Sequence, residues 1–381
     1  MLNLDESLFH WSNVYGSYLR TTGATYLGFS SLMALNPFMA PISNEIEKWG
    51  RYLVERGRPM ERPTWFSPNQ VVYEGFKVAL RKFNRTHLGH PIVFVAPEAG
   101  HNAHIVDYGP EQSLVECALN HFPGDVYAVD KQPAGPEHTA YDIDDSILSL
   151  KACAEAIGEP IHLVGLCQGG WQSAIFAALF PEHVRSLTLA AAPIDFHAGD
   201  ATIARWAKAI PQSTYEQMVM LGNGNMPGCF IVQGFMLMNP YDRFVGDDTG
   251  LLRNITDAEF IERHRRFTQW YYYTQAVPGT MYLNIVKKLF KENQLIQGEL
   301  EVLGRKVDLG RIHHPLYLVA GQKDDITPPP QLFAAEHYVS SEIVQKAVMP
   351  AGHIGVFMGK QVIRDYWRHH LPQLLAYAFA N

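Results

Sequence analysis

Residues 162–171 read HLVGLCQGGW, an apolar run that ends in Cys167, which stands between Gly165 and Gly169. A sharp turn from a strand into a helix needs glycines at these places, because side chains beside the turn would collide. At the start of a helix, the free N–H groups and the helix dipole favour a negative charge on sulfur. This stretch therefore predicts a strand, a tight turn with a reactive thiol, and a helix. The alternative is a buried, inert cysteine in a glycine-rich turn.

The chain on both sides of this turn alternates between strand-like and helix-like segments. A hairpin is expected over 71–83, turning near Glu74 and Gly75. Amphipathic stretches at 144–158 and 172–184 predict helices, the second broken at Pro181. Short apolar runs typical of strands buried on both faces occur at 91–96, 125–130, 161–166, 186–192, 315–321 and 344–350. We expect an α/β fold with a mostly parallel central sheet flanked by helices.

Three regions of different character are expected along the chain. Residues 1–65 form a helical N-terminal extension, 66–197 and 306–381 form the α/β core, and 198–305 form a helical cap inserted between two strands. Residues 25–40 are apolar, but they are interrupted by Gly28, Asn36 and Pro37 and are too short to span a bilayer. We therefore expect a docking helix and no transmembrane segment.

Composition narrows the function classes. The 381 residues carry a formal net charge of −7 without a long run of lysine and arginine, which argues against nucleic-acid binding and for a small substrate. The four cysteines, Cys117, Cys153, Cys167 and Cys229, lack metal-ligand spacing. We expect no metal, no cofactor and a reducing, cytoplasmic location.

The cysteine turn also predicts where its partners lie. In α/β-hydrolases a nucleophile on such an elbow is followed by an acid after a later strand and a histidine after the last strand. Asp324 and Asp325 follow the apolar run 315–321, and His353 follows the run 344–350. We expect His353 to accept the thiol proton and Asp324, favoured over Asp325, to orient the imidazole.

An oxyanion hole should complete this site. The backbone N–H of Gln168 is one expected donor, and the N–H of Glu98 or Ala99, after the run 91–96, is the other. The segment FTQWYYYTQ, 267–275, is interpreted as core of the cap, with lining of an acyl tunnel as an alternative. Supporting, packing, turn or surface roles are expected for the remaining candidates: supporting for His101 and His104, surface or packing for His313, His314, His369 and His370, supporting or turn for Asp195, and buried and inert for Cys117 and Cys153.

With these residues in view, the chain resembles the polyhydroxyalkanoate synthase family, above all the short catalytic subunits of its two-component type. The resemblance covers most of 65–375 and rests on GLCQGG (165–170), API-DF (192–196), AGQKDDITPP, AGHIGVFMG (351–359) and the segment 292–312. It implies an α/β-hydrolase fold and a Cys167–His353–Asp324 triad that polymerises 3-hydroxyacyl-CoA. It also implies a homodimer or a partner subunit bound through the N-terminal helices, and association with storage granules.

Some segments depart from the synthase pattern. PEAGHNAH, 97–104, is more similar to intracellular polyhydroxyalkanoate depolymerases, AVDKQPAG (128–135) lacks the usual Asp-Trp, and Trp171 is bulky for its place. Three functions therefore remain open: acyl transfer from CoA thioesters, hydrolysis of esters, thioesters or polyester by the same triad, and a catalytically silent granule or scaffold protein. A cysteine acyl-enzyme is itself a thioester, which favours transfer from acyl-CoA.

Overall fold

A computed structural model describes residues 4–84, 86–240 and 246–374, and these divide into two compact units. Residues 64–226 and 276–381 belong to the first, here called the sheet unit, and residues 1–63 and 227–275 to the second, the helical unit. The residues expected as a cap are thus shared between the units, since 198–226 and 276–305 belong to the sheet unit. Their role as a lid over a site stays a prediction.

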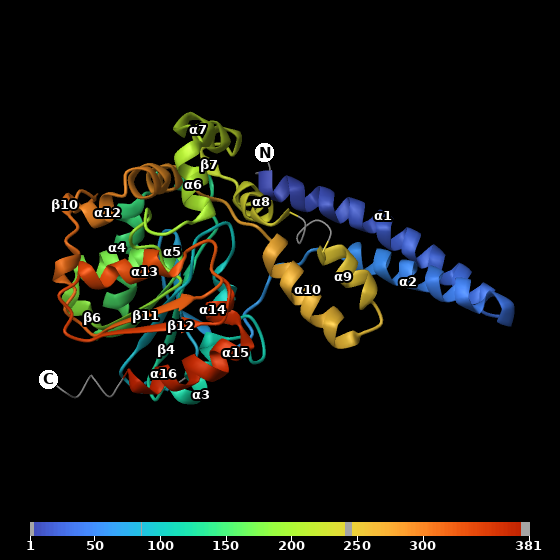
Figure 1. The fold of residues 1–381 in the computed structure, drawn as a ribbon, viewed down its shortest axis with the longest axis horizontal. Helices are drawn as coiled ribbons and strands as arrows, with labels where there is room; N and C mark the ends of the chain where they lie inside the picture. Colours follow the sequence, from blue (N-terminus) through green and yellow to red (C-terminus); the bar gives the residue numbers. More distant parts are fainter. Residues whose placement is uncertain (1–3, 85, 241–245, 375–381) are drawn as a thin grey trace. The chain divides into compact units, whose positions relative to one another are not determined.

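Within the described residues, the sheet unit contains an eight-stranded sheet of order β1-β2-β4-β3-β5-β6-β11-β12 (Figure 1). β2 pairs antiparallel with both β1 and β4, and the pairs from β4 to β12 are parallel. This arrangement confirms the expected hairpin and the mostly parallel sheet. The strands are β1 (Gln70–Glu74), β2 (Val78–Lys82), β3 (Ile92–Val95), β4 (Val126–Lys131), β5 (Ile161–Leu166), β6 (Val184–Ala190), β11 (Leu316–Gly321) and β12 (Val344–Met349).

Burial explains why the central strands read as continuous apolar runs. Every residue of β3, β5 and β11 is buried, because helices cover both faces of a parallel sheet. α4 contacts α5, and α3 contacts α16, and Figure 1 shows these two pairs on opposite sides of the sheet. The helices of this unit are α3 (Leu114–His121), α4 (Ile143–Ile157), α5 (Gln168–Leu179), α6 (Thr202–Ala209), α7 (Gln212–Leu221), α11 (Gly279–Asn284), α12 (Gln294–Gln297), α13 (Pro329–Phe333), α14 (Gly355–Met358), α15 (Lys360–Val362) and α16 (Arg368–Gln373).

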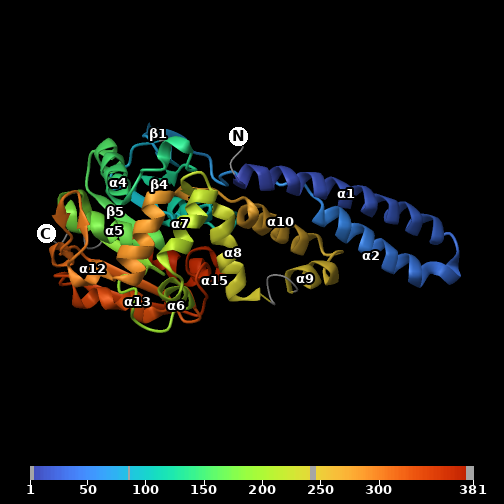
Figure 2. The same cartoon turned by 90° about the horizontal axis from the view of Figure 1, so that it is seen from above.

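The helical unit is built on an antiparallel hairpin of α1 and α2, which lie side by side in both views (Figures 1 and 2). Asp5 joins α1 to the later segment, because its carboxylate accepts hydrogen bonds from the backbone N–H of Gly228 at 3.0 Å and of Cys229 at 2.9 Å. No helix among the described residues is long and apolar enough to cross a membrane. The helices of this unit are α1 (Leu4–Met33), α2 (Ala40–Arg56), α8 (Gly228–Met238), α9 (Asp247–Arg253) and α10 (Ala258–Tyr272).

The expectation that Gly28 interrupts the first apolar segment is wrong. α1 continues through Gly28 to Met33, and a Cβ atom at residue 28 would meet nothing within 4 Å. A single glycine weakens a helix by only about 1 kcal/mol, which a 30-residue helix tolerates. The chain does turn at Asn36, whose side chain accepts a hydrogen bond from the N–H of Phe38 and begins the short helix Pro37–Met39.

Candidate active site

Cys167 lies between β5 and α5, at the turn where the sequence predicted it. Its backbone has φ 49° and ψ −118°, in a region that residues with side chains rarely adopt. Two backbone hydrogen bonds hold this conformation, from the N–H of Cys167 to Ala190 O and from the N–H of Gly170 to Cys167 O, both 2.9 Å long. The side chain is 9% exposed. The strained backbone carries the sulfur at the end of a central strand.

The glycines around Cys167 are required by close backbone approaches. A Cβ atom on Gly165 would lie 2.6 Å from the Cα of Gly170, and one on Gly169 would lie 2.1 Å from the carbonyl oxygen of Val95. A Cβ atom on Gly170 would lie 2.2 Å from that of Ala192. Helix α5 therefore begins in contact with the ends of the neighbouring strands, and this contact fixes the position of the turn.

Asp324 and His353 form a buried pair in the loops that follow β11 and β12. The imidazole Nδ1 lies 2.8 Å from Oδ2 and 3.0 Å from Oδ1 of Asp324. Asp324 Oδ1 also accepts hydrogen bonds from the N–H groups of Ile326, at 3.0 Å, and Thr327, at 2.8 Å, so its carboxylate is held in place. Asp324 is buried and Asp325 is exposed, which makes Asp324 the carboxylate paired with the imidazole.

The imidazole of His353 also interacts with the sulfur of Cys167. Burial by itself would lower the pKa of His353, but attraction to Asp324 and to Cys167, with hydrogen bonds to both, raises it well above 6.5. Since the carboxylate engages Nδ1, Nε2 is the nitrogen that can exchange a proton with the sulfur. The structure therefore brings together the three residues predicted as a triad, and their catalytic roles belong to the proposal below.

The residues predicted for an oxyanion hole lie at two neighbouring places. Gln168 is the first residue of α5, where backbone N–H groups have no acceptor within the helix. Glu98 and Ala99 lie in the loop after β3 and are 2% and 7% exposed. Because α5 contacts the end of β3 through Gly169, this loop starts beside the first turn of α5. The arrangement suits two N–H donors that converge on one oxygen atom.

The side chain of Glu98 takes part in a buried charge network that the sequence analysis missed. Its carboxylate is paired with the ammonium group of Lys77, and Lys131 Nζ lies 3.9 Å away. Lys77 is 1% exposed, and burial lowers the pKa of Lys131 to about 8. The sequence feature that could have indicated this network is Lys131, a lysine that directly follows the apolar run DVYAVD (125–130). The network anchors the loop that carries the predicted oxyanion donors.

Asp195 and Asn293 brace the chain after β6, and Asn293 was also missed. The Asn293 side chain donates to Asp195 Oδ1 at 2.8 Å and accepts from the N–H of Phe196 at 3.0 Å. Asn293 has φ 54°, a left-handed conformation that asparagine tolerates better than most residues. These bonds agree with the supporting role expected for Asp195.

Among the other histidines singled out in the sequence, His313 and His369 are exposed, whereas His101, His104 and His370 are buried. His104 Nδ1 lies 2.7 Å from Asn102 Oδ1, and no group of three or more metal-ligating side chains occurs among the described residues. Burial lowers the pKa of both His314 and His370 to about 4. Burial raises the pKa values of the Cys117, Cys153 and Cys229 thiols to about 12. These thiols are poor nucleophiles for this reason.

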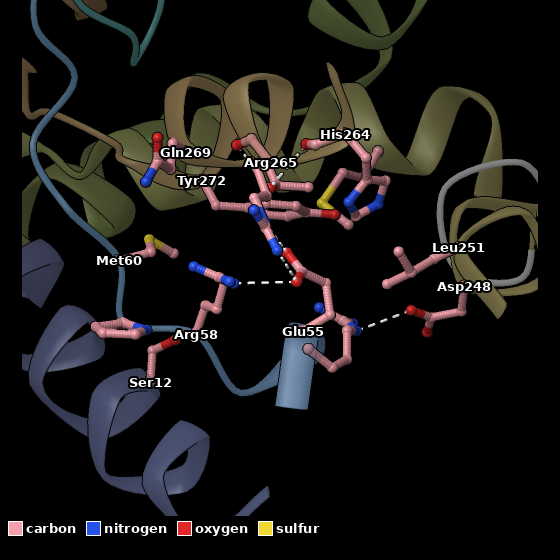
Figure 3. A pocket seen from close by; sticks show the side chains of 14 residues that line it. Ser12, Glu55, Arg58, Met60, Asp248, Leu251, His264, Arg265, Gln269 and Tyr272 are labelled. Atoms are coloured by element: carbon pink, nitrogen blue, oxygen red, sulfur yellow. Dashed lines mark hydrogen bonds and ion pairs between the residues drawn. The ribbon is translucent and has the colours of Figure 1, made fainter. Parts of the chain in front are cut away.

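The aromatic segment 267–275 belongs to α10 and the residues after it, in the helical unit. Trp270 and Tyr271 are buried there, so the interpretation of this segment as core is supported. The unit also has a hollow of about 300 Å³, shown in Figure 3. Glu55 at its centre accepts hydrogen bonds from Arg265 at 2.6 Å and Arg58 at 3.0 Å. Burial would raise the pKa of Glu55, but these arginines lower it. Arg56 is paired with Asp248, so both carboxylates lining this hollow have arginine partners.

Comparison with known proteins identifies relatives of this chain. A family described as "Protein of unknown function (DUF3141)" matches residues 44–373. The chain is 30% identical to the poly(3-hydroxyalkanoate) polymerase subunit PhaC of Haloferax mediterranei over 310 residues, which are 79% of this chain and 62% of that protein. It is 27% identical to the PhaC subunit of Synechocystis over 336 residues, 82% of this chain and 84% of that one. The predicted resemblance to this group of polymerases is thereby confirmed.

Solved structures support the fold. A carboxylesterase structure from Nitrososphaera gargenis superposes with a TM-score of 0.51 at 14% sequence identity, covering 81% of this chain and 99% of that one. The predicted α/β-hydrolase fold is therefore confirmed, with the mainly parallel sheet and the N-terminal helices described above.

Proposed function

Since the chain belongs to the DUF3141 family, we propose for it a cysteine-dependent acyl transfer that joins 3-hydroxyacyl groups from CoA thioesters into a polyester or oligoester. The observation that carries the proposal is the contact of His353 with both Cys167 and Asp324 at the elbow. The similarity to PhaC polymerase subunits supports the substrate class. The chain spans 62% of the length of the Haloferax relative. The activity and substrate class of that protein are therefore proposals for this chain.

In the first step, the sulfur of Cys167 attacks the carbonyl carbon of the thioester. His353 takes the thiol proton through Nε2, and Asp324, held to Nδ1 at 2.8 Å, stabilises the resulting imidazolium. The N–H of Gln168 and an N–H of the Glu98–Ala99 loop stabilise the oxyanion. The carbon–sulfur bond to CoA then breaks, and the imidazolium returns its proton to the departing CoA thiolate.

In the second step, the hydroxyl group of another hydroxyacyl chain attacks the acyl group on Cys167. His353 removes the hydroxyl proton and returns it to the sulfur, which leaves as a thiol. Acylation of a thiol by acyl-CoA exchanges one thioester for another, so it costs little free energy, whereas ester formation from a thioester is downhill. This energetic match favours cysteine over serine for transfer from CoA.

Hydrolysis by the same triad is the second candidate function. The loop PEAGHNAH, with the buried Glu98 and Ala99, resembles the corresponding loop of intracellular polyhydroxyalkanoate depolymerases. In a hydrolase, water takes the place of the hydroxyl group in the second step, and exclusion of water from the site decides between the two outcomes.

Product analysis separates the two functions. The purified chain is incubated with 3-hydroxybutyryl-CoA and, separately, with p-nitrophenyl esters, and both CoA release and oligomer length are measured. Transfer predicts CoA release together with oligoester, abolished in Cys167→Ala and strongly reduced in Cys167→Ser. CoA release without oligomer, alongside fast ester hydrolysis, would reject the transferase and support the hydrolase. Full turnover in Cys167→Ala would reject both.

A further inference from the structure

The two helices of the N-terminal hairpin contact each other through their backbones. A Cβ atom on Gly23 would lie 2.6 Å from Gly50 O, and one on Gly57 would lie 2.3 Å from Gly16 O. Ser43 Oγ donates to Ser30 O at 2.8 Å. Residues 16, 23 and 30 of α1 are thus matched with Gly57, which caps α2, and with residues 50 and 43 of α2, at seven-residue spacing in each segment. Small residues let the two backbones approach, and the side chains of Leu27 and Val54 pack against Gly50 and Gly23 in the same interface.

Another face of α1 carries exposed aromatic and apolar side chains. They recur at spacings of three and four residues over 8–18 and of three residues over 26–32, with Thr22 between the two groups. Trp11, Tyr15 and Tyr18 lie toward the start of α1, and purely apolar side chains lie toward the hairpin turn. The exposed fractions are Leu8 44%, Trp11 67%, Tyr15 64%, Tyr18 67%, Tyr26 43%, Phe29 54% and Leu32 68%.

Four hydroxyl groups in the second half of α1 have partners within the helix. The hydroxyl groups of Thr21, Thr22 and Thr25 each donate to the carbonyl oxygen four residues earlier, at 3.0 Å, and Ser31 does the same at 2.9 Å. A hydroxyl bonded in this way needs no water, so it can enter an apolar medium at low cost.

The turn of the hairpin is uncharged. Residues 21–44 contain no Asp, Glu, Lys or Arg, and the next charges form the ion pairs Glu45–Lys48 at 2.7 Å and Glu47–Arg51 at 2.7 Å. From the pairing of residue 30 with 43 and 23 with 50, Glu45 lies level with Gly28 on α1. We call residues 29–44, beyond that level, the hairpin tip. Its side chains include Leu35, 81% exposed, and Phe38, 93% exposed.

The tip is short enough to lie within one leaflet of a bilayer. From Phe29 to the end of α1 at Met33 the helix rises about 6 Å, at 1.5 Å per residue, and the turn at 34–36 follows. Half of the hydrocarbon core of a bilayer is about 15 Å thick. Tyr26 and Trp49 lie near the level of the first charges, and tyrosine and tryptophan prefer the boundary between water and hydrocarbon.

We propose that the hairpin tip inserts into the hydrocarbon of one leaflet of a neutral phospholipid bilayer, with Tyr26 and Trp49 at its boundary. The charge pattern favours hydrocarbon over an anionic surface, because the tip carries no positive charge to attract phosphate groups. A second hairpin packed alongside would cover a helix face but leave Leu35 and Phe38 at the turn exposed. Both views show the turn beyond α9 and α10, which leaves it accessible within the helical unit (Figures 1 and 2).

Flotation with phosphatidylcholine vesicles tests the proposal on the full chain. The test variant carries Leu35→Asp and Phe38→Asp, which replace exposed side chains and so leave the helices intact. A matched control carries Met220→Asp and Leu221→Asp on α7, where the side chains are 71% and 68% exposed. We expect wild type and control to float equally, also in about 1 M salt, where the Debye length is about 3 Å. The test variant should bind about 100-fold more weakly, since each buried apolar side chain contributes about tenfold.

Three flotation results would overturn the proposal. The first is absence of wild-type flotation, including the case in which the chain binds polyester particles but not vesicles. The second is flotation that requires anionic lipid or disappears in salt. The third is equal flotation of test variant and wild type. Light scattering without lipid adds a further arm: an oligomer that only the test variant loses would assign the tip to a second copy of the chain, against the proposal. Circular dichroism verifies that both variants remain folded.

Discussion

Gly169→Ala is the substitution whose effect follows most directly from the elbow. The added Cβ atom would lie 2.1 Å from the carbonyl oxygen of Val95 and 2.8 Å from its carbonyl carbon. Ordinary contacts begin at 3.4 Å, so the end of β3 and the start of α5 must separate by about 1.3 Å. The two Val95 atoms belong to the backbone of the sheet, and the position of the added Cβ atom is fixed by the backbone of α5. No side-chain rotation can therefore relieve the clash.

This separation moves Gln168 away from the loop of Glu98 and Ala99. A misplacement of about 1 Å at a reacting centre can reduce the rate about 100-fold. Overpacking of this kind costs about 1–3 kcal/mol of unfolding free energy. We therefore expect kcat/KM for CoA release from 3-hydroxybutyryl-CoA to fall about 100-fold, while thermal unfolding remains cooperative at a moderately lower temperature.

Gly234→Ala is the control. Gly234 lies in α8, where an added Cβ atom would meet nothing within 4 Å. We expect unchanged activity and a gain of about 1 kcal/mol in unfolding free energy, from the better helix propensity of alanine. Wild-type activity in Gly169→Ala, with a cooperative unfolding transition, would refute the reasoning that this contact positions the two halves of the oxyanion hole.

Other predictions follow from the same structure. Asp324→Asn should reduce acyl transfer by about 10⁴-fold by analogy with other triads, whereas Asp325→Asn should have little effect; equal losses in steady-state assays would contradict the pairing. Lys77→Met should cost about 3 kcal/mol in urea unfolding because it leaves Glu98 buried with a weaker partner, and adding Glu98→Gln should restore most of the loss; a fully additive double variant would count against the network. Because the folded-state pKa of His353 is raised, its stabilising contribution should be complete below pH 6.5 and disappear as the pH rises through that pKa. The difference in unfolding free energy between wild type and His353→Gln should shrink accordingly, and a difference that grows with pH would be inconsistent with this sign.

Much of the sheet unit could be predicted because its signals are local. Central strands such as β3 and β5 are buried at every position, so each appears as an uninterrupted apolar run. The candidate triad could be predicted because the ends of parallel strands meet at one edge, so Cys167, Asp324 and His353 could be ordered by strand alone. The choice between Asp324 and Asp325 rested on adjacent positions and needed the burial of each carboxylate.

The rest depends on contacts between residues far apart in the chain. Arg265 lies 2.6 Å from Glu55, a contact that helps to join residues 227–275 to the N-terminal hairpin and that no periodicity reveals. The pairing of Lys77 with Glu98 joins the turn of the β1–β2 hairpin to a loop, so neither residue is conspicuous by itself. Gly28 gave the wrong expectation because one glycine costs a long helix only about 1 kcal/mol, so its presence in the sequence does not mark a break.

The central claim is that the sulfur of Cys167 becomes covalently acylated. Mass spectrometry of the intact chain, quenched soon after mixing with 3-hydroxybutyryl-CoA and followed by peptide mapping, measures this directly. The account predicts a mass increase of one or more whole hydroxybutyryl groups on the peptide that contains Cys167, absent in Cys167→Ala and labile to neutral hydroxylamine, as a thioester is. Turnover without any adduct on that peptide, or the same adduct in Cys167→Ala, would contradict it.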